Sequence, residues 1–465
     1  MKPITVKDIL AVCQGAKLVC GSPDAICTNF SKDTRTITPG DVYVGIKGER
    51  FDGNALYPEA IQNGASVCIL QDVTIGEAEK ETYQNCAIIL VEDTIQAIQE
   101  IAAYKRSLYH IPVVAITGSV GKTSTKDLVA SVLAEKYQVL KTEGNLNNHI
   151  GVPMTILRLK EEELLVVEMG MDHAGEIRNL TNIAKPTIAV ITNVGTSHIG
   201  QLGSQEAIFN AKLEILEGLS EEGTIVINND NELLHNWYEE KKNTYPQTII
   251  TYGIQNKSDI MAKDITLAED GSTFTAKTKE EEFTIQVPVA GEHFVYNSLC
   301  ATCVAEVLQE KKEQIQAGIQ KVELTKRRMD IQTIGRYTII NDCYNANYDS
   351  MKAAIHYLGS THKGTKIAIL GDMLNLGEYS EDLHRKVGQE AELAHTDIVI
   401  TVGFFSQYIN EEAKSAQNIH CQTNEEAIEE AKKVMKPDSC ILIKASNSMK
   451  FDEIANQLIE YLQSL

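Results

Sequence analysis

The sequence predicts an α/β protein divided into three domains. First, 465 residues are enough for about three domains of roughly 150 residues each. Second, short apolar runs are each followed by a helical pattern, which is typical of parallel α/β units. Third, this rhythm breaks once, between residues 259 and 289, where the alternation indicates antiparallel strands. We expect a small mixed α/β domain over residues 1–108, a central domain with a parallel sheet over 109–325 and a Rossmann-like domain over 326–465.

The expected strands are the apolar, β-branched runs of each domain. In the first domain they are "DVYVGI" and "SVCILQ", and a helix follows in "TIQAIQEIAAYKRSLY". In the second they are "VVAITG", "LLVVEMG", "TIAVITNVG" and "GTIVINND", and the helix "EHFVYNSLCATCVAEVLQ" follows the antiparallel stretch. In the third they are "YTIINDC", "TKIAILGDM", "DIVITVG" and "SCILIKAS".

The composition is that of a water-soluble globular chain. Hydrophobic residues make up 43% and charged residues 23%, and no apolar run approaches the roughly 20 residues that a membrane helix needs. No signal peptide opens the chain, so we expect a cytoplasmic protein without membrane insertion. The net charge of −21 argues against a nucleic-acid partner, because phosphate contacts need clustered Lys and Arg.

The ten cysteines are scattered along the chain. The pair Cys300 and Cys303 falls in an apolar helical pattern, and no second pair lies nearby to complete a zinc site. We therefore expect reduced, structural thiols rather than a metal or redox site.

The stretch "VVAITGSVGKTSTKD", residues 113–127, predicts a phosphate-binding loop between a buried strand and a helix. Gly118 and Gly121 allow the backbone N–H groups to converge on an anion, and the helix dipole and Lys122 add positive charge. Thr123 offers a hydroxyl to Mg²⁺. The strict G-x-x-x-x-G-K-[ST] pattern fails, because Ile116 stands at its first glycine. A glycine-containing turn with an exposed lysine is the alternative.

Polar residues follow later strands of the same predicted sheet. Glu168 closes "LLVVEMG" and His198 follows "TNVGTS", so both can converge with the Thr123 hydroxyl at the carboxyl edge of the sheet. Mg²⁺ prefers oxygen ligands, so a hydrogen-bonded loop histidine remains an alternative for His198. Lys212 in "NAKLEIL" has the alternative of a solvated lysine.

The stretches "TGSVGKTSTKD", "GNLNNHIGVPMT", "VVEMG", "TNVGTSHIG" and "AKLEIL" resemble the central domain of the Mur ligases, which are ATP-dependent amide-forming enzymes. The phosphate loop of that family is the shorter G-x-x-G-K-[ST], which does not need a glycine at Ile116. Residues 31–53, 341–351 and 370–384 are most similar to the members that join D-alanyl-D-alanine to UDP-N-acetylmuramoyl-tripeptide in peptidoglycan synthesis. The D-N-P-R motif of the ligases that add the third peptide residue is absent.

The resemblance implies ATP and Mg²⁺ as cofactors, the UDP-linked tripeptide and the dipeptide as small-molecule substrates, an acyl-phosphate intermediate and a monomer. Two other classes remain open. One is a related amino-acid ligase with a different amine substrate, either a Mur-type paralogue or a folylpolyglutamate-synthetase-like enzyme. The other is a non-catalytic nucleotide-binding regulator.

The resemblance also implies roles for individual residues. The nucleotide would contact Thr117, Gly118, Ser119, Val120, Gly121, Lys122, Thr123, Ser124, Asn297, Arg328 and Asp342. The catalytic residues would be Lys122, Lys212, His198 and Arg328. Mg²⁺ would be held by Thr123, Glu168, His198 and Lys212, the last as a carbamate. The substrates would contact Ser31, Asp33, Arg35, Asn145, Asn147, Asn148, Asn345 and Asn347. For Ser31, Asp33 and Arg35 a capped turn is the alternative.

Three motifs depart from the family pattern. Phe294 stands at the last position of G-x-H-N and Tyr348 at the last position of N-A-N-P. In K-G-S-R, Ala445 replaces the glycine and Asn447 replaces the arginine. At the last position a neutral amide replaces an arginine fork suited to an anion, so a variant amine substrate stays open.

Overall fold

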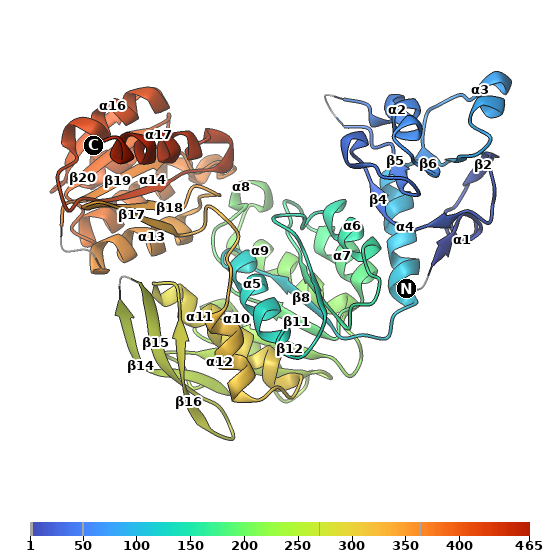
Figure 1. Cartoon of the computed structure of the whole chain (residues 1–465). Coiled ribbons are helices and arrows are strands. Elements are labelled where there is room, and N and C mark those ends of the chain that lie inside the picture. Colours follow the sequence, from blue (N-terminus) through green and yellow to red (C-terminus); the bar gives the residue numbers. More distant parts are fainter. Residues whose placement is uncertain (1–2, 49–50, 269, 362–363) are drawn as a thin grey trace.

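The computed structural model describes residues 3–48, 51–268, 270–361 and 364–465. These residues form three α/β bodies that follow one another along the chain, coloured blue, green to yellow and orange to red in Figure 1. The predicted fold class is confirmed, whereas the predicted domain boundaries stay a prediction. Glu49 and Arg50 of the 31–53 segment lie outside the described residues.

The first body is built on a five-stranded sheet with the order β2-β7-β6-β5-β4. β2 pairs antiparallel with β7 and the other neighbours are parallel, so the predicted mixed character is confirmed. The long helix α4 leads from this body into the central one (Figure 1). The elements are β1 (Ile4–Thr5), α1 (Val6–Val12), β2 (Lys17–Cys20), β3 (Ile26–Cys27), β4 (Phe30–Ser31), β5 (Val42–Val44), α2 (Tyr57–Gln62), β6 (Val67–Leu70), α3 (Glu77–Thr82), β7 (Ala87–Leu90) and α4 (Thr94–Ser107).

The central body contains a nine-stranded sheet with the order β16-β15-β14-β13-β12-β11-β8-β10-β9. The strands from β14 to β9 in this order run parallel, and β15 and β16 extend the sheet antiparallel, as predicted for residues 259–289. β8 is buried along its whole length between β11 and β10. The strands are β8 (Val113–Thr117), β9 (Val139–Lys141), β10 (Leu164–Glu168), β11 (Ile188–Ile191), β12 (Thr224–Asn228), β13 (Thr248–Gly253), β14 (Ile260–Ala268), β15 (Gly271–Lys277) and β16 (Glu282–Val287).

Two groups of helices cover this sheet. α5, α11 and α12 pack together, and α4, α6 and α7 pack together. The predicted helix with Cys300 and Cys303 is α11, and both thiols are buried in the apolar core. The helices are α5 (Lys122–Leu133), α6 (Gly151–Leu157), α7 (Glu176–Ala184), α8 (Ile199–Leu202), α9 (Gln205–Leu213), α10 (Glu232–Lys241), α11 (Glu292–Val307) and α12 (Lys312–Gln320).

The third body has a six-stranded sheet with the order β17-β18-β22-β19-β20-β21. β17 is antiparallel to β18 and the remaining pairs are parallel, which is a Rossmann-like arrangement. The elements are β17 (Asp330–Ile334), β18 (Tyr337–Asn341), α13 (Tyr348–Thr361), β19 (Lys366–Gly371), α14 (Ser380–Leu393), β20 (Ile398–Val402), α15 (Gln407–Glu412), β21 (Gln417–Cys421), α16 (Asn424–Val434), β22 (Cys440–Lys444) and α17 (Asp452–Gln463).

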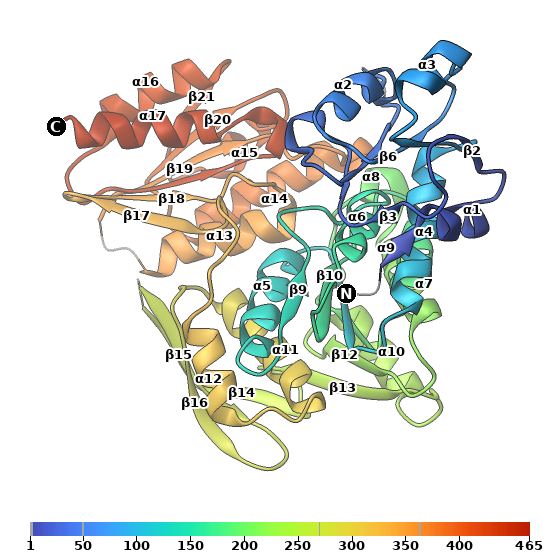
Figure 2. The same ribbon diagram turned by 45° about the vertical axis from the view of Figure 1, so that its right-hand side comes forward.

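The third body is docked on the central one, as Figures 1 and 2 show from two directions. The Tyr379 hydroxyl donates to the Gly203 carbonyl at 2.8 Å. A Cβ on Gly200 would lie 2.6 Å from the backbone nitrogen of Gly377, so the two backbones meet where no side chain intervenes. This docking brings the carboxyl edge of the central sheet against the third body.

A buried carboxylate anchors the connection between the two bodies. Asp127 on α5 accepts from the backbone N–H of Thr325 at 3.0 Å and from its hydroxyl at 2.8 Å, just before the third body begins. Lys141 donates to the same carboxylate at 2.8 Å, and the buried Lys126 lies 3.3 Å away. Burial alone raises the pKa of Asp127, but the nearby charge of Lys126 and the hydrogen bonds lower it overall.

We expect Asp127→Asn to destabilise the central body at pH 7, by about 3 kcal/mol, because it leaves the buried Lys126 cation without its partner. The folded-state pKa of Asp127 lies below its unfolded value, so the carboxylate adds stability above that unfolded value, roughly 3.9. This contribution is lost as the pH falls through the folded-state pKa, so the difference between wild type and variant should shrink in acid.

The measurement is urea unfolding followed by the fluorescence of Trp237, the chain's single tryptophan, from pH 7 to pH 3. The exposed Glu239→Gln on α10 serves as the control and should change stability by less than about 0.5 kcal/mol. A variant as stable as wild type at pH 7 would show that Asp127 does not hold this connection.

Candidate active site

The predicted phosphate loop lies at the carboxyl end of β8 and leads into α5, as the sequence indicated. Gly118 has φ of 151°, and a Cβ there would lie 1.9 Å from the Thr192 hydroxyl oxygen, so only glycine fits. Gly121 is left-handed with φ of 79° and precedes the first residue of α5. The helix dipole therefore points its positive end into the loop.

The loop rests on the segment that follows the neighbouring strand β11, residues 192–198. The Asn193 side-chain oxygen accepts from the backbone N–H of Ser119 at 3.0 Å and of Val120 at 2.9 Å. The Thr192 hydroxyl donates to the Val120 carbonyl at 2.7 Å. Sequence reasoning missed both supports, although their place directly after a strand of the same sheet was a usable signal.

Lys122 curls back over the loop. Its ammonium donates to the Gly118 carbonyl at 2.7 Å and to the Ser119 carbonyl at 3.3 Å. Burial lowers the pKa of Lys122, and the negative charge of Glu168 opposes this shift. The ammonium therefore lies beside the loop, where it could bind an anionic ligand.

Thr123 and Glu168 meet as predicted. The Thr123 hydroxyl donates to Glu168 Oε1 at 3.2 Å, and Asn147 Nδ2 donates to the same oxygen at 2.8 Å. Arg328 Nη2 donates to the Thr123 hydroxyl oxygen at 2.9 Å, and the Arg328 guanidinium stacks 4.1 Å from the centre of the Tyr344 ring. Among the described residues, the buried Glu168 Oε2 has no hydrogen-bond partner.

His198 and Lys212 both lie close enough to Lys122 for its positive charge to act on them. His198 is left-handed, with φ of 65°, and its Nδ1 lies 2.9 Å from Asp172 Oδ1, although the two are not aligned for a hydrogen bond. Burial lowers the pKa of His198, and the positive charges of Lys122 and Lys212 lower it further. Burial and Lys122 likewise hold the pKa of Lys212 well below its usual range. Three basic side chains thus share one buried region.

A cavity of about 540 Å³ opens beside the loop, between the central and third bodies. Asn297 on α11 lies in its wall, accepting from the Thr125 hydroxyl at 3.1 Å, and its buried Nδ2 has no partner among the described residues. Ser119 to Ser124 line the cavity, but the predicted nucleotide contacts Thr117 and Gly118 do not. The Thr117 hydroxyl instead donates to the Met169 carbonyl at 2.9 Å. The predicted residues from the third body that line it are Arg328, Asp342, Asn345 and Asn347.

Lys444 organises the third-body wall of this cavity, which sequence reasoning did not foresee. Its buried ammonium donates to Asp342 Oδ2 at 2.6 Å and to the Asn345 carbonyl at 2.9 Å. Asp342 also accepts from the backbone N–H of Met329 at 3.1 Å. These contacts place Asp342 and Asn345 at the cavity.

A second cavity of about 290 Å³ adjoins the first and shares Asn345 and Asn347 with it. It also contains His198, and Asn447 lies in its wall at the position that departs from the family pattern. Its remaining lining residues are Ser197, Ala346, Leu374, Asn375, Leu376, Ser446 and Ser448. The two cavities therefore share part of one wall, and the phosphate loop lines the first of them.

The other departures have local explanations. Phe294 is buried in the wall of the larger of these two cavities. Tyr348 begins α13, and its hydroxyl donates to Glu390 Oε1 at 2.7 Å, while Lys352 lies 2.8 Å from the same oxygen. The Tyr348 hydrogen bond therefore ties the start of α13 to the neighbouring helix α14.

The remaining predicted substrate residues are not gathered at these cavities. Asn148 accepts from Ile150 and Gly151 at the start of α6, at 3.1 and 2.9 Å, and the Asn145 carbonyl accepts from the backbone of Asn147. In the first body Ser31, Asp33 and Arg35 form a capped turn, in which the exposed Arg35 guanidinium grips the Asp33 carboxylate at 2.6 and 2.9 Å. Their predicted roles stay predictions.

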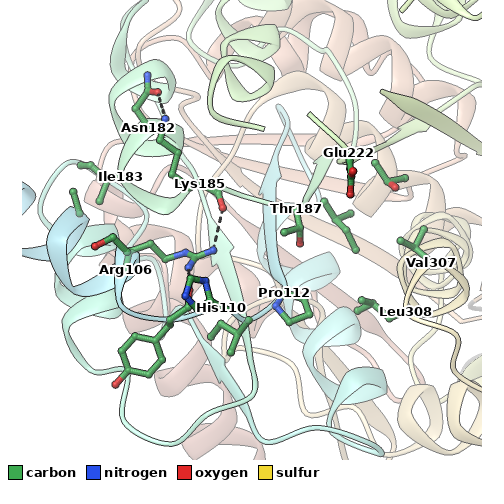
Figure 3. A pocket seen from close by; sticks show the side chains of 16 residues that line it. Arg106, His110, Pro112, Asn182, Ile183, Lys185, Thr187, Glu222, Val307 and Leu308 are labelled. Atoms are coloured by element: carbon green, nitrogen blue, oxygen red, sulfur yellow. Dashed lines mark hydrogen bonds between the residues drawn. The ribbon is translucent and has the colours of Figure 1, made fainter. Parts of the chain in front are cut away.

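A cavity of about 790 Å³ lies at the opposite, amino edge of the sheet (Figure 3). The Arg106 guanidinium in its wall donates to the carbonyls of Ala184, Tyr109 and Lys185 at 2.7, 2.6 and 3.2 Å, and Lys185 donates to Asn182 at 2.9 Å. This cavity is not lined by any residue of the phosphate loop, so it is separate from the candidate active site.

Two further properties of the described residues bear on function. No group of three or more His, Cys, Asp or Glu side chains in them is arranged to hold a metal ion. No helix in them has both the length and the apolar character for a membrane crossing.

Comparison with known proteins adds independent information. Three family models match in order: "Mur ligase family, catalytic domain" over residues 11–106, "Mur ligase middle domain" over 116–305 and "Mur ligase, glutamate ligase domain" over 327–447. The Bacillus subtilis UDP-N-acetylmuramoyl-tripeptide–D-alanyl-D-alanine ligase is 37% identical over 464 residues, which cover 98% of each chain.

Solved structures agree with these matches. A crystal structure of MurF from Acinetobacter baumannii has a TM-score of 0.88 at 29% identity and covers 99% of each chain. The MurF ligase of Thermotoga maritima in complex with ADP has a TM-score of 0.82 at 27% identity, covering 94% of this chain and 98% of its own. With models matching along all three bodies and a relative this similar over nearly its whole length, the chain belongs to the Mur ligase family.

Proposed function

We propose that this chain is an ATP-dependent ligase that joins D-alanyl-D-alanine to UDP-N-acetylmuramoyl-tripeptide during peptidoglycan precursor synthesis. The observation that carries the proposal is a pair of neighbouring cavities: one is lined by the phosphate loop, and Asn345 and Asn347 line both. The cavity beside the loop suits a nucleotide and the smaller cavity suits an amine. A carboxyl group that is activated by the nucleotide between the two cavities can then be attacked by the amine. The full-length match to a ligase of that name supports the choice of substrates.

In this proposal ATP occupies the cavity of about 540 Å³ beside the phosphate loop. Its phosphates lie against the phosphate loop, where Lys122 turns from the loop carbonyls to the transferring phosphoryl group. The unpartnered Asn297 Nδ2 is available to an acceptor on the base, and Arg328 and Asp342 close over the nucleotide from the third body. The ADP-bound neighbour structure agrees with a nucleotide in this fold.

The residues at the loop suit Mg²⁺. The buried Glu168 Oε2 lacks a partner among the described residues, and an orphaned carboxylate oxygen is a natural ligand for a hard cation. We propose Thr123, Glu168, His198 and carbamylated Lys212 as the residues that hold the metal. A bound Mg²⁺ would supply charge neutralisation for the phosphoryl group.

The proposed chemistry has two steps. A carboxylate oxygen of the tripeptide attacks the γ-phosphorus of ATP and the bond to ADP breaks, which gives an acyl phosphate. The dipeptide amine then attacks the acyl carbon, phosphate leaves and the amine loses a proton. Lys122 lowers the barrier of the first step by positioning positive charge where the phosphoryl group passes. Docking of the third body excludes water from the acyl phosphate.

The two substrates would arrive from opposite sides. We place the amine in the smaller cavity, near Asn345 and Asn347, and the UDP group on the first body, near Ser31, Asp33 and Arg35. We also propose that Asn145, Asn147 and Asn148 contact the substrate, and the hydrogen bond from Asn147 to Glu168 supports this for Asn147. We further propose that the enzyme is cytoplasmic, because its proposed substrates are water-soluble nucleotides and peptides, and that it is a monomer.

An assay of ADP release tests this proposal against its alternatives. Purified protein receives ATP, Mg²⁺ and the UDP-linked tripeptide, with D-alanyl-D-alanine, single D- or L-amino acids, or glutamate as the amine. We expect turnover with the dipeptide. Turnover with a single amino acid alone would favour a paralogue with another amine. Glutamate addition in a parallel reaction with a folate in place of the tripeptide would favour the folylpolyglutamate-synthetase-like class. Nucleotide binding without turnover would favour the regulator.

Lys122→Ala should leave the fold intact and lower kcat by roughly a thousandfold, because a positioned cation leaves the phosphoryl-transfer site. The same ADP-release assay measures the loss, and circular dichroism checks the fold. Lys242→Ala, an exposed lysine beside α10, is the matched control and should turn over normally. Near-normal turnover of Lys122→Ala would contradict the assignment of the loop.

Lys212→Ala should also lose most activity, and added acetate or propionate should restore part of it. The buried Lys212 amine has a pKa well below the usual range, so free amine is available to react with CO₂ and become an anionic oxygen ligand. ¹³CO₂-labelled NMR of the parent protein should show a carbamate signal that is missing in the variant. Full activity of the alanine variant would show that Lys212 has no part in the reaction.

A further inference from the structure

One carboxylate crosses the boundary between the central and third bodies and has no role in the chemistry above. Asp349, in the first turn of α13, accepts from the backbone N–H of Thr196 at 3.0 Å. The Thr196 hydroxyl lies 3.3 Å from the same oxygen, Oδ2. Thr196 belongs to the 192–198 segment that supports the phosphate loop.

The neighbouring Gly195 makes this approach possible. A Cβ at Gly195 would lie 2.2 Å from Asp349 Oδ2 and 2.7 Å from its Cγ. Gly195 is not among the glycines with positive φ, so its backbone does not itself require glycine. Glycine is needed at position 195 because the Asp349 carboxylate of the third body occupies the space that a Cβ would fill.

The same segment continues to the phosphate loop. The Gly195 N–H donates to the Ser119 hydroxyl oxygen at 2.9 Å, and the Ser197 hydroxyl donates to the Ser119 carbonyl at 3.2 Å. Asn347, two residues before Asp349, donates to the Ser197 hydroxyl. A continuous set of hydrogen bonds thus runs from the phosphate loop through the 192–198 segment to the first turn of α13.

We propose that Asp349 is a positioning residue: its carboxylate, seated over Gly195, fixes the start of α13 so that Asn345 and Asn347 face the phosphate loop. The reaction that this alignment serves rests on the proposed function. Loss of the contact lets the amine side of the site shift relative to the activated carboxyl group. A shift of about 1 Å is enough to slow a reaction roughly a hundredfold.

An acidic residue in a first helical turn also stabilises its helix through the dipole, and the test must separate that role. Asp382 provides the match. It lies in the first turn of α14 in the same body, but its side chain is 62% exposed and pairs with Lys386 at 2.8 Å. The helix-dipole role predicts equal effects at both positions, whereas the positioning role predicts an effect at Asp349 alone.

The experiment compares Asp349→Ala, Asp349→Asn, Gly195→Ala, the Asp349→Ala/Gly195→Ala double variant and Asp382→Ala in the full-length protein. For each, kcat and the KM for the UDP-linked substrate are measured. We expect Asp349→Ala to lower kcat roughly ten- to a hundredfold with the KM unchanged within about twofold. Asp349→Asn, which keeps an acceptor oxygen, should recover most of the loss, and Asp382→Ala should match wild type.

Gly195→Ala should reproduce the Asp349→Ala defect, and the double variant should be no worse than either single one, because both changes break the same contact. Multiplying defects in the double variant, an equal loss in Asp382→Ala, or normal kcat in Asp349→Ala would overturn the proposal. If Gly195→Ala fails to fold, the comparison of the Asp349 variants with Asp382→Ala decides.

Small-angle scattering with ATP separates this inference from the proposed function. Asp349→Ala should have a larger radius of gyration than wild type and Asp382→Ala, whether or not any dipeptide is ligated. Equal radii in all three proteins would overturn the positioning role. A wild-type protein that is compact but does not ligate the dipeptide would instead contradict the proposed function alone.

Discussion

The contact between the phosphate loop and the 192–198 segment is the constraint on which the rest of the site depends. β8 and β11 are parallel neighbours, so the segments that leave their carboxyl ends must meet. Gly118 lies against Thr192 where a Cβ has no room, and Asn193 binds two loop N–H groups. Thr192 and Asn193 therefore fix the position of the loop, and the third body docks on the same 192–198 segment.

Charge is concentrated where this contact occurs. The chain as a whole carries a net charge of −21, yet Lys122 and Arg328 lie close together at the carboxyl edge of the central sheet. Burial and the positive charge of Arg328 lower the pKa of Lys122, because the charged form of this side chain is unfavourable away from water and beside another cation. A polyphosphate would relieve that cost, so the local field selects for a nucleotide although the surface charge would repel one.

Much of this arrangement could be predicted from the sequence, because it depends on local pattern. The buried runs of the central sheet predicted β8, β10, β11 and β12, and two glycines before a lysine predicted the loop. β21 was not predicted, since it is an edge strand whose residues are mostly exposed and polar. The turn formed by Ser31, Asp33 and Arg35 agrees with the alternative reading of those residues, and only a bound substrate would reveal a further role.

The supports of the site were missed for a different physical reason. Asn193 binds Ser119 across 74 residues of sequence, and Lys444 binds Asp342 across 102. From the sequence, Asp349 is an ordinary acidic residue in the first turn of a helix, and its contact with the central body exists only in the tertiary structure. No periodicity or spacing reports such partners, because each pairing is created by the tertiary fold.

Transfer of ¹⁸O tests most directly the central claim that these bodies assemble one site for carboxyl activation and amide formation. The reacting carboxylate of the UDP-linked tripeptide is labelled with ¹⁸O at both oxygens, and the phosphate released with D-alanyl-D-alanine is examined by ³¹P NMR. The account predicts one ¹⁸O in the phosphate for each amide formed, because a carboxylate oxygen leaves with the phosphoryl group. Amide formation with unlabelled phosphate would contradict it.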